Sequence, residues 1–105
     1  MVRHRIHQTI TLGRFGDGIK WASDMNEVAR NNGWAQWRVI VPFSGPRNQM
    51  ILESEYPDFA TMHSESDAFY SNPEGMAVFR RSNELIAVGT HPWDEVEEEA
   101  PLELA

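Results

Sequence analysis

Cysteine is missing from this sequence of 105 residues. Its absence excludes disulfide frameworks, thiol nucleophiles and zinc sites with cysteine ligands, and it fits a reducing compartment. The first residues run straight into an alternating segment, without the apolar core of a secretory signal. No stretch approaches the roughly 18 apolar residues that a membrane-spanning helix needs. We therefore expect a cytoplasmic protein with no membrane partner.

Basic residues are few: the chain has nine lysines and arginines and sixteen aspartates and glutamates, which gives a formal net charge of -7. Six of the acids fall in residues 94–105, where no base occurs, so residues 1–93 hold ten acids and nine bases. A nearly neutral body predicts no charge-driven binding to nucleic acid. We expect residues 1–93 to form one domain and residues 94–105 to be a solvated acidic tail, whose removal from Glu95 onward leaves the fold intact.

The overall composition is that of an ordinary globular protein. Hydrophobic residues make up 41% of the chain and charged residues 24%, far from the composition of disordered proteins. A single domain of this size buries only about two thirds of the surface of its unfolded chain. Association with a second copy would cover more apolar area, so we expect a homodimer.

Hydrophobic spacing predicts a strand, a helix and a hairpin in the first half of the chain. Residues 4–12 alternate between apolar and polar side chains, which is the period of a strand. In residues 19–32 the apolar positions recur every three or four residues, as in a helix, and Gly33 is a good C-terminal stop. Residues 36–43 and 48–56 alternate again around a Gly-Pro turn, which predicts an antiparallel hairpin.

The second half of the chain predicts a broken helix and a last strand. Helical spacing runs from Phe59 to Phe79 but is interrupted near Ser71-Asn72-Pro73, where proline can open a second helical piece. Residues 84–90 carry the apolar run of the final strand, which Pro92 ends. The order β-α-β-β-α-β predicts an α+β fold of the ferredoxin-like type. Such a fold has a four-stranded antiparallel sheet in the order 4-1-3-2 with both helices on one face.

Three features of the layout carry a family resemblance: the hairpin of residues 37–56, the helix opening at Asp58-Phe59, and the loop Ser71-Asn72-Pro73-Glu74-Gly75 before the second helical piece. Over residues 4–92 the chain resembles the dimeric α/β-barrel superfamily, and within it the NIPSNAP-like and antibiotic-biosynthesis-monooxygenase-like proteins. The resemblance implies two sheets packed face to face across a dimer. Members include cofactor-independent oxygenases, haem-degrading enzymes and proteins of no known activity, so the resemblance implies a fold more narrowly than a function. The haem-degrading members rely on Asn, Trp and His, and no asparagine occurs in the first predicted strand.

Polar side chains gather on the sheet face opposite the apolar sets. We predict that His7, Arg38, Glu53 and His91 form a ligand-binding cleft on this face. His91, at the end of the last strand, is expected beside His7. Glu53, on a third strand taken as parallel to the first, is expected nearer the far end of that first strand. This offset argues against a metal site made of the two histidines and the carboxylate, and we expect no tightly bound cofactor. The residues expected on this face are Arg5, His7, Thr9, Thr11, Arg38, Ile40, Gln49, Ile51, Glu53, Glu55, Leu85, Ala87, Gly89 and His91.

Four tryptophans are a high number for so short a chain. Trp21 and Trp37 fall on apolar faces and are predicted to lie in the core. Trp34 and Trp93 lie beside the ends of predicted elements, where a large aromatic side chain is typical of an interface.

The leading hypothesis is a homodimeric domain that binds a small organic molecule between its sheet and helices or at the dimer cleft. One alternative is a cofactor-independent monooxygenase or isomerase, with His7 or His91 as base and Arg38 as anion stabiliser. The other is a stress-related interaction module without catalysis. An enclosed cavity with titratable groups would favour the enzyme, an apolar cavity the binding domain, and a filled interior the interaction module.

Overall fold

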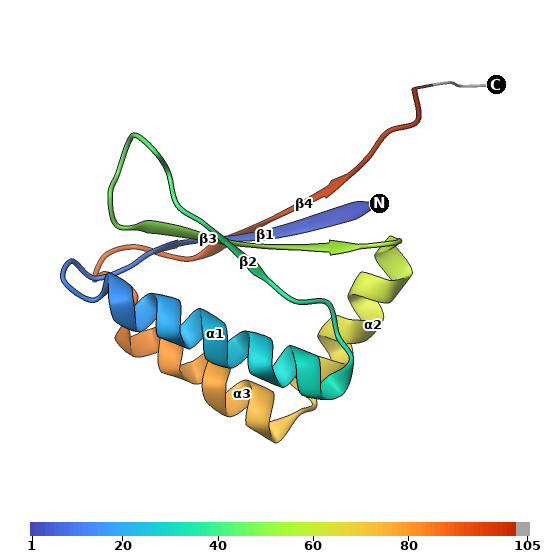
Figure 1. Cartoon of the computed structure of the whole chain (residues 1–105), viewed down its shortest axis with the longest axis horizontal. Helices are drawn as coiled ribbons and strands as arrows, with labels where there is room; N and C mark the ends of the chain where they lie inside the picture. The colour runs from blue at the N-terminus through green and yellow to red at the C-terminus, as the bar shows by residue number, and fades with distance from the viewer. Residues whose placement is uncertain (103–105) are drawn as a thin grey trace.

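The helices of this protein lie on one face of a four-stranded sheet and leave the other face uncovered (Figure 1). The computed structural model describes residues 1–102. The strand order is β2-β3-β1-β4 and all neighbouring strands are antiparallel, which confirms the predicted ferredoxin-like α+β fold. The elements are β1 (Val2–Thr9), α1 (Phe15–Asn32), β2 (Arg38–Ile40), β3 (Gln49–Tyr56), α2 (Phe59–Tyr70), α3 (Pro73–Arg80) and β4 (Trp93–Glu98).

The main core lies between the sheet and α1. Met50 and Leu52, on one face of β3, are fully buried in a cluster with Trp21 and Met25 of α1. The indole N–H of Trp21 donates a hydrogen bond of 2.8 Å to the carbonyl of Val78, so burial of this large side chain leaves no polar atom unpaired. The predicted core position of Trp21 is confirmed.

The helix ends follow their local sequence signals. Helix α1 stops at Gly33, whose φ of 70° is the left-handed conformation that glycine adopts most easily. The Asp58 side chain accepts a hydrogen bond of 2.7 Å from the backbone N–H of Thr61 and caps α2. Asn72 caps α3 in the same way, and Pro73 is the first residue of that helix. The predicted break between the two helical pieces is therefore confirmed.

The last strand lies later in the chain than predicted. Arg81–Glu84 is a short 3₁₀ helix, and residues 85–87 pair only briefly with the chain just after β1, through an isolated bridge between Ile10 and Ile86. Leu85, expected on the polar face, is a core residue that is 5% exposed. The prediction of a final strand at residues 84–90 is wrong because this apolar segment closes the end of the core instead of extending the sheet.

Strand β4 is acidic, and its glutamates face basic side chains of β1 across the antiparallel ladder. Glu95 lies directly opposite Arg5, and Glu97 lies directly opposite Arg3. Cross-strand pairs of opposite charge stabilise a sheet edge without apolar burial, so the hydrophobic pattern of β4 is weak. The expectation that residues 94–98 belong to a solvated tail is therefore wrong. Residues 103–105, the end of that predicted tail, lie outside the described residues.

The third strand runs antiparallel to the first, which corrects the expected position of Glu53. The α1 crossover makes β2 parallel to β1, and the hairpin then reverses the chain into β3. Arg5 is therefore the direct neighbour of Glu53 on β1.

Candidate ligand-binding site

The predicted cleft residues do not share one cavity. Arg38, Glu53 and His7 lie on the open face, by which we mean the sheet face turned away from the helices. His91 lies in the loop before β4 and not on a strand. His7 and His91 border a depression of about 20 Å³ together with Trp93. That space suits about one water molecule, so a ligand-binding role for these residues stays a prediction.

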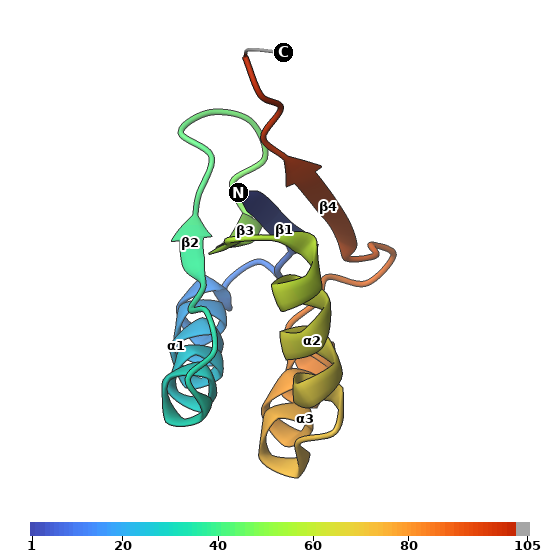
Figure 2. The ribbon, with the colours of Figure 1, turned by 90° about the vertical axis from the view of Figure 1, so that its right-hand side faces the viewer.

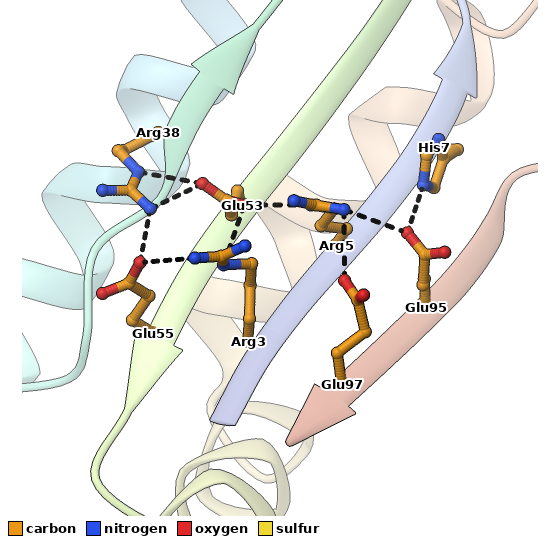
Figure 3. A network of polar contacts seen from close by, with 8 residues as sticks. All are labelled: Arg3, Arg5, His7, Arg38, Glu53, Glu55, Glu95 and Glu97. Atoms are coloured by element: carbon orange, nitrogen blue, oxygen red, sulfur yellow. Dashed lines mark hydrogen bonds and ion pairs between the residues drawn. The ribbon is translucent and has the colours of Figure 1, made fainter. Parts of the chain in front are cut away.

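Glu53 is the centre of an ion-pair network on the open face (Figure 3). Its side chain is only 6% exposed. Its Oε1 accepts a hydrogen bond of 2.9 Å from Arg5 Nε, and Arg3 Nε lies 3.2 Å from the same oxygen. Its Oε2 accepts a hydrogen bond of 3.1 Å from Arg38 Nε. Arg38 also donates to Glu55 at 2.7 Å, so this guanidinium is already engaged by two carboxylates.

The three arginines keep Glu53 ionised. Burial by itself would raise the pKa of the Glu53 carboxyl, but hydrogen bonds from Arg5 and Arg38 and the nearby charges of Arg38 and Arg3 hold that pKa below its usual range. The hydrogen bond to Glu53 in turn raises the pKa of Arg5. These groups therefore carry fixed charges at neutral pH and are poorly suited to exchange protons with a substrate.

His7 is held between a carboxylate and an indole at the β4 edge of the network. Its Nε2 lies 3.2 Å from Glu95 Oε1, and Arg5 Nη1 lies 3.4 Å from the same oxygen. The hydrogen bond with His7 lowers the pKa of Glu95, against a smaller opposing effect of burial. The His7 ring also stacks on Trp93, with ring centroids 3.8 Å apart and planes 1° from parallel. The hydrogen bond to Glu95 and the stack on Trp93 hold the His7 ring against β4, as expected for a side chain that supports the sheet.

A cavity of about 510 Å³ lies on the opposite side of the sheet. This helix-side cavity sits beneath β1, where α1 and the α2–α3 pair diverge below the sheet (Figure 2). The segment that leads into β4 contributes to its wall. Aromatic side chains form much of the lining: Trp34, Trp37, Tyr56, Phe69, Tyr70 and Phe79.

His4 and Gln8 bring polar groups from β1 to the helix-side cavity. His4 Nε2 lies 2.9 Å from Asp94 Oδ2, and its ring meets Trp37 edge-on with centroids 5.2 Å apart. Gln8 is 5% exposed. The Nδ1 of His4 and the Oε1 of Gln8 are buried and have no hydrogen-bond partner within residues 1–102. An unpaired buried polar group costs about 1–3 kcal/mol, so these atoms mark places where a bound molecule can supply partners.

Sequence reasoning missed these two residues although a signal was available. His4 and Gln8 share the parity of Ile6 and therefore the buried face of β1. In an alternating strand, a polar residue at a position that should be apolar points to a buried polar group, which often has a specific role. Trp37 packs against the core as predicted, and it also lines the cavity. Trp34, predicted at an interface, contributes to the cavity wall.

Within residues 1–102, no three His, Asp or Glu side chains lie close enough together to hold a metal ion. No helix in this part of the chain has the length and apolar character needed to cross a membrane.

Several solved structures resemble this protein in fold, although their sequences differ widely from it. No protein-family model matches the chain, and no curated protein matches it in sequence. An uncharacterized NIPSNAP domain protein from Burkholderia xenovorans superposes with a TM-score of 0.77 at 17% identity, over 100% of both chains. A NIPSNAP family protein from Agrobacterium tumefaciens gives a TM-score of 0.74 at 14% identity, over 96% of this chain and 94% of that one.

An antibiotic biosynthesis monooxygenase is also similar, with a TM-score of 0.73 at 12% identity, over 96% of this chain and 100% of the other. The resemblance to NIPSNAP-like and monooxygenase-like folds is confirmed at the level of the fold. At identities this low a shared fold does not imply a shared function, so the chemistry of the site has to be argued from the residues of this chain.

Proposed function

We propose that this protein binds a small organic molecule in the helix-side cavity, without a tightly held cofactor, and that it does so as a homodimer whose open faces meet. The cavity is the observation that carries the proposal. Its volume of about 510 Å³ falls within the range of about 300–1,000 Å³ that is usual for ligand pockets. Its aromatic walls, with polar side chains among them, are also typical of such pockets.

Homodimerisation is supported by the uncovered sheet face. Ile40, Ile51, His7 and Trp93 lie in one row across all four strands. Trp93 is 55% exposed in the single chain. A second copy over this face would cover the row and would shield the ion pairs of Glu53 from water.

Blocking the cavity tests the binding proposal directly. Ser66 lies on α2 and lines the cavity, whereas the exposed Ser64 on the same helix does not. We expect Ser66→Trp to fill part of the cavity and to weaken binding of an uncharged fluorescent aromatic dye by about tenfold or more. Ser64→Trp is the matched control and should bind the dye like the parent chain. Equal affinities for all three proteins would place the dye elsewhere.

A second candidate function is an enzyme that uses the same cavity. It is favoured by the hydrogen bond between His4 and Asp94, because a carboxylate on one ring nitrogen orients an imidazole for proton transfer at the other. This candidate uses His4 in place of His7 or His91. Solvent deuterium incorporation into a bound ketone tests it: His4→Gln should abolish incorporation while the ketone still binds. The remaining alternative, an interaction module without catalysis, was expected to have a filled interior. The helix-side cavity therefore gives that alternative no support.

A further inference from the structure

We infer that the helix-side cavity selects aromatic ligands that are cationic or that donate hydrogen bonds, and that it discriminates against aromatic carboxylates. This inference rests on the proposed function and adds the charge and chemical class of the ligand. It follows from the charges, the acceptors and the aromatic surfaces that line the cavity.

The charged groups that line the cavity are almost all of one sign. Glu65 from α2 and Asp94 from β4 contribute carboxylates, and His4 is paired with Asp94. No lysine or arginine is among the described residues of the lining. The guanidinium groups of β1 and β2 lie on the open face, on the other side of the sheet. A bound anion would therefore meet two carboxylates with no lysine or arginine beside them.

Unpaired acceptors favour a ligand that donates. The Oε1 of Gln8 is an acceptor with no partner within residues 1–102, on a residue that is 5% exposed. Glu65 is half-buried, and within the described part of the chain its Oε1 accepts one hydrogen bond, of 2.7 Å, from the backbone N–H of Ala35. An ammonium group or a hydroxyl group can donate to such acceptors, whereas a carboxylate ion has no proton to donate.

Aromatic surfaces favour the same ligand class. The walls contain two indoles, of Trp34 and Trp37, and the Trp34 ring meets Phe69 edge-on with centroids 6.2 Å apart. A planar ligand can pack against such rings, and their π faces attract a cation. Hydroxyl and amide groups of Ser82 and Asn83 could donate to an anion, but neutral donors compensate a desolvated charge less well than an opposite charge does.

A series of naphthalene probes that share one ring system and carry a cationic, a neutral or an anionic group tests the inference. The probes are 2-naphthylmethylamine, 2-naphthylmethanol and 2-naphthoate, titrated into the full chain by calorimetry at neutral pH. We expect the amine to bind tightest and the carboxylate to bind at least about tenfold more weakly than the amine. Carboxylate binding equal to or tighter than that of the amine would overturn the inference and leave the proposed function standing. Absence of binding by all three probes at millimolar concentration would overturn both.

A matched pair of variants assigns the selectivity to the cavity. Glu65→Gln keeps the size of the side chain and an oxygen that can accept from Ala35, but it removes the charge. We expect this change to reduce the amine-to-carboxylate affinity ratio to about one third or less of the parent value. Glu27→Gln, on the exposed side of α1 and outside the lining, should leave the ratio unchanged. Equal ratios in the parent and Glu65→Gln proteins would also contradict the inference, and near-ultraviolet circular dichroism shows whether each variant is folded.

Discussion

Glu53 accepts a hydrogen bond of 2.9 Å from Arg5, the residue directly opposite it in the pairing of β1 with β3. The same row of the sheet continues to Arg38 on β2 and to Glu95 on β4. Charges therefore alternate in sign across all four strands. This row explains how an acidic segment becomes an edge strand: Glu95 and its neighbours find cationic partners that are already fixed by the central pair.

Replacing Glu53 should destabilise the fold. Glu53→Gln keeps the size of the side chain but leaves three guanidinium groups around a neutral amide. We expect the free energy of unfolding to fall by about 1–3 kcal/mol, measured by urea denaturation. Glu55→Gln is the control, because Glu55 is 34% exposed and its ion pairs are worth about 1 kcal/mol at most. Equal effects of the two changes would show that burial of Glu53 is unimportant.

The same carboxylates should make the fold sensitive to acid. The pKa values of Glu53 and Glu95 are lowered in the folded state from an ordinary value of 4.5. A lowered pKa means that the stabilisation is fully present above the pKa of the unfolded chain and is lost as pH falls through the folded pKa. We expect the thermal midpoint to drop as the pH is lowered below about 4.5, and to drop less steeply in Glu53→Gln. Parallel curves for the two proteins would argue against this role of Glu53.

Truncation should be more harmful than the acidic composition of the C-terminal end indicates. Deleting residues 95–105 removes most of β4 and its cross-strand partners for Arg3 and Arg5. We therefore expect the thermal midpoint to fall by more than about 8 °C, which reverses the expectation from sequence that the fold is unaffected. Deleting only residues 100–105 leaves all of β4 in place and should have a much smaller effect.

The open face should bring two copies together. Light scattering at micromolar concentration is expected to give twice the chain mass of 12.0 kDa. Ile51→Glu places a carboxylate in the middle of that face and should shift the mass toward that of one chain. Leu12→Glu, in an exposed turn away from the sheet, is the control and should remain dimeric. A parent protein of 12.0 kDa at this concentration would contradict the proposal.

Periodicity predicted most of the fold because the elements that build the core carry clear apolar spacing. The α1 stripe ended at Gly33, and the break before Pro73 had both a cap and a proline to mark it. Strand β4 could not be found in this way, because its partners are charges on β1 and the pairing is visible only once the strands are placed. Strand β4 does alternate, with Trp93 and Glu95 on one face and Val96 on the other. Only two of its six residues are apolar, however, so the alternation gives little hydrophobic signal.

The candidate site was harder to predict than the fold. Strand parity identified a polar face correctly, and Arg38 and Glu53 are in contact there. A cavity, however, depends on how far two helices diverge below a sheet, which no local pattern encodes. Gln8 was visible in the sequence as a polar residue among apolar neighbours on the same face of β1, but its unpaired oxygen was not.

That oxygen supports a last prediction, in which two buried polar residues on the same sheet face respond in opposite ways. Gln8→Met removes an acceptor that has no partner within residues 1–102 and replaces it with an apolar side chain of similar size. The free energy of unfolding should stay the same or rise, because no hydrogen bond is lost. Ser54→Ala removes a hydroxyl that donates at 3.0 Å to the carbonyl of Gln36, and it should cost about 0.5–1.5 kcal/mol. Urea denaturation of both variants without ligand measures the contrast.

Titration with 2-naphthylmethylamine should then show weaker binding to Gln8→Met and unchanged binding to Ser54→Ala, because Gln8 lines the cavity and Ser54 does not. Destabilisation of the ligand-free protein by Gln8→Met would mean that Gln8 is a structural residue and not an acceptor held ready for a ligand.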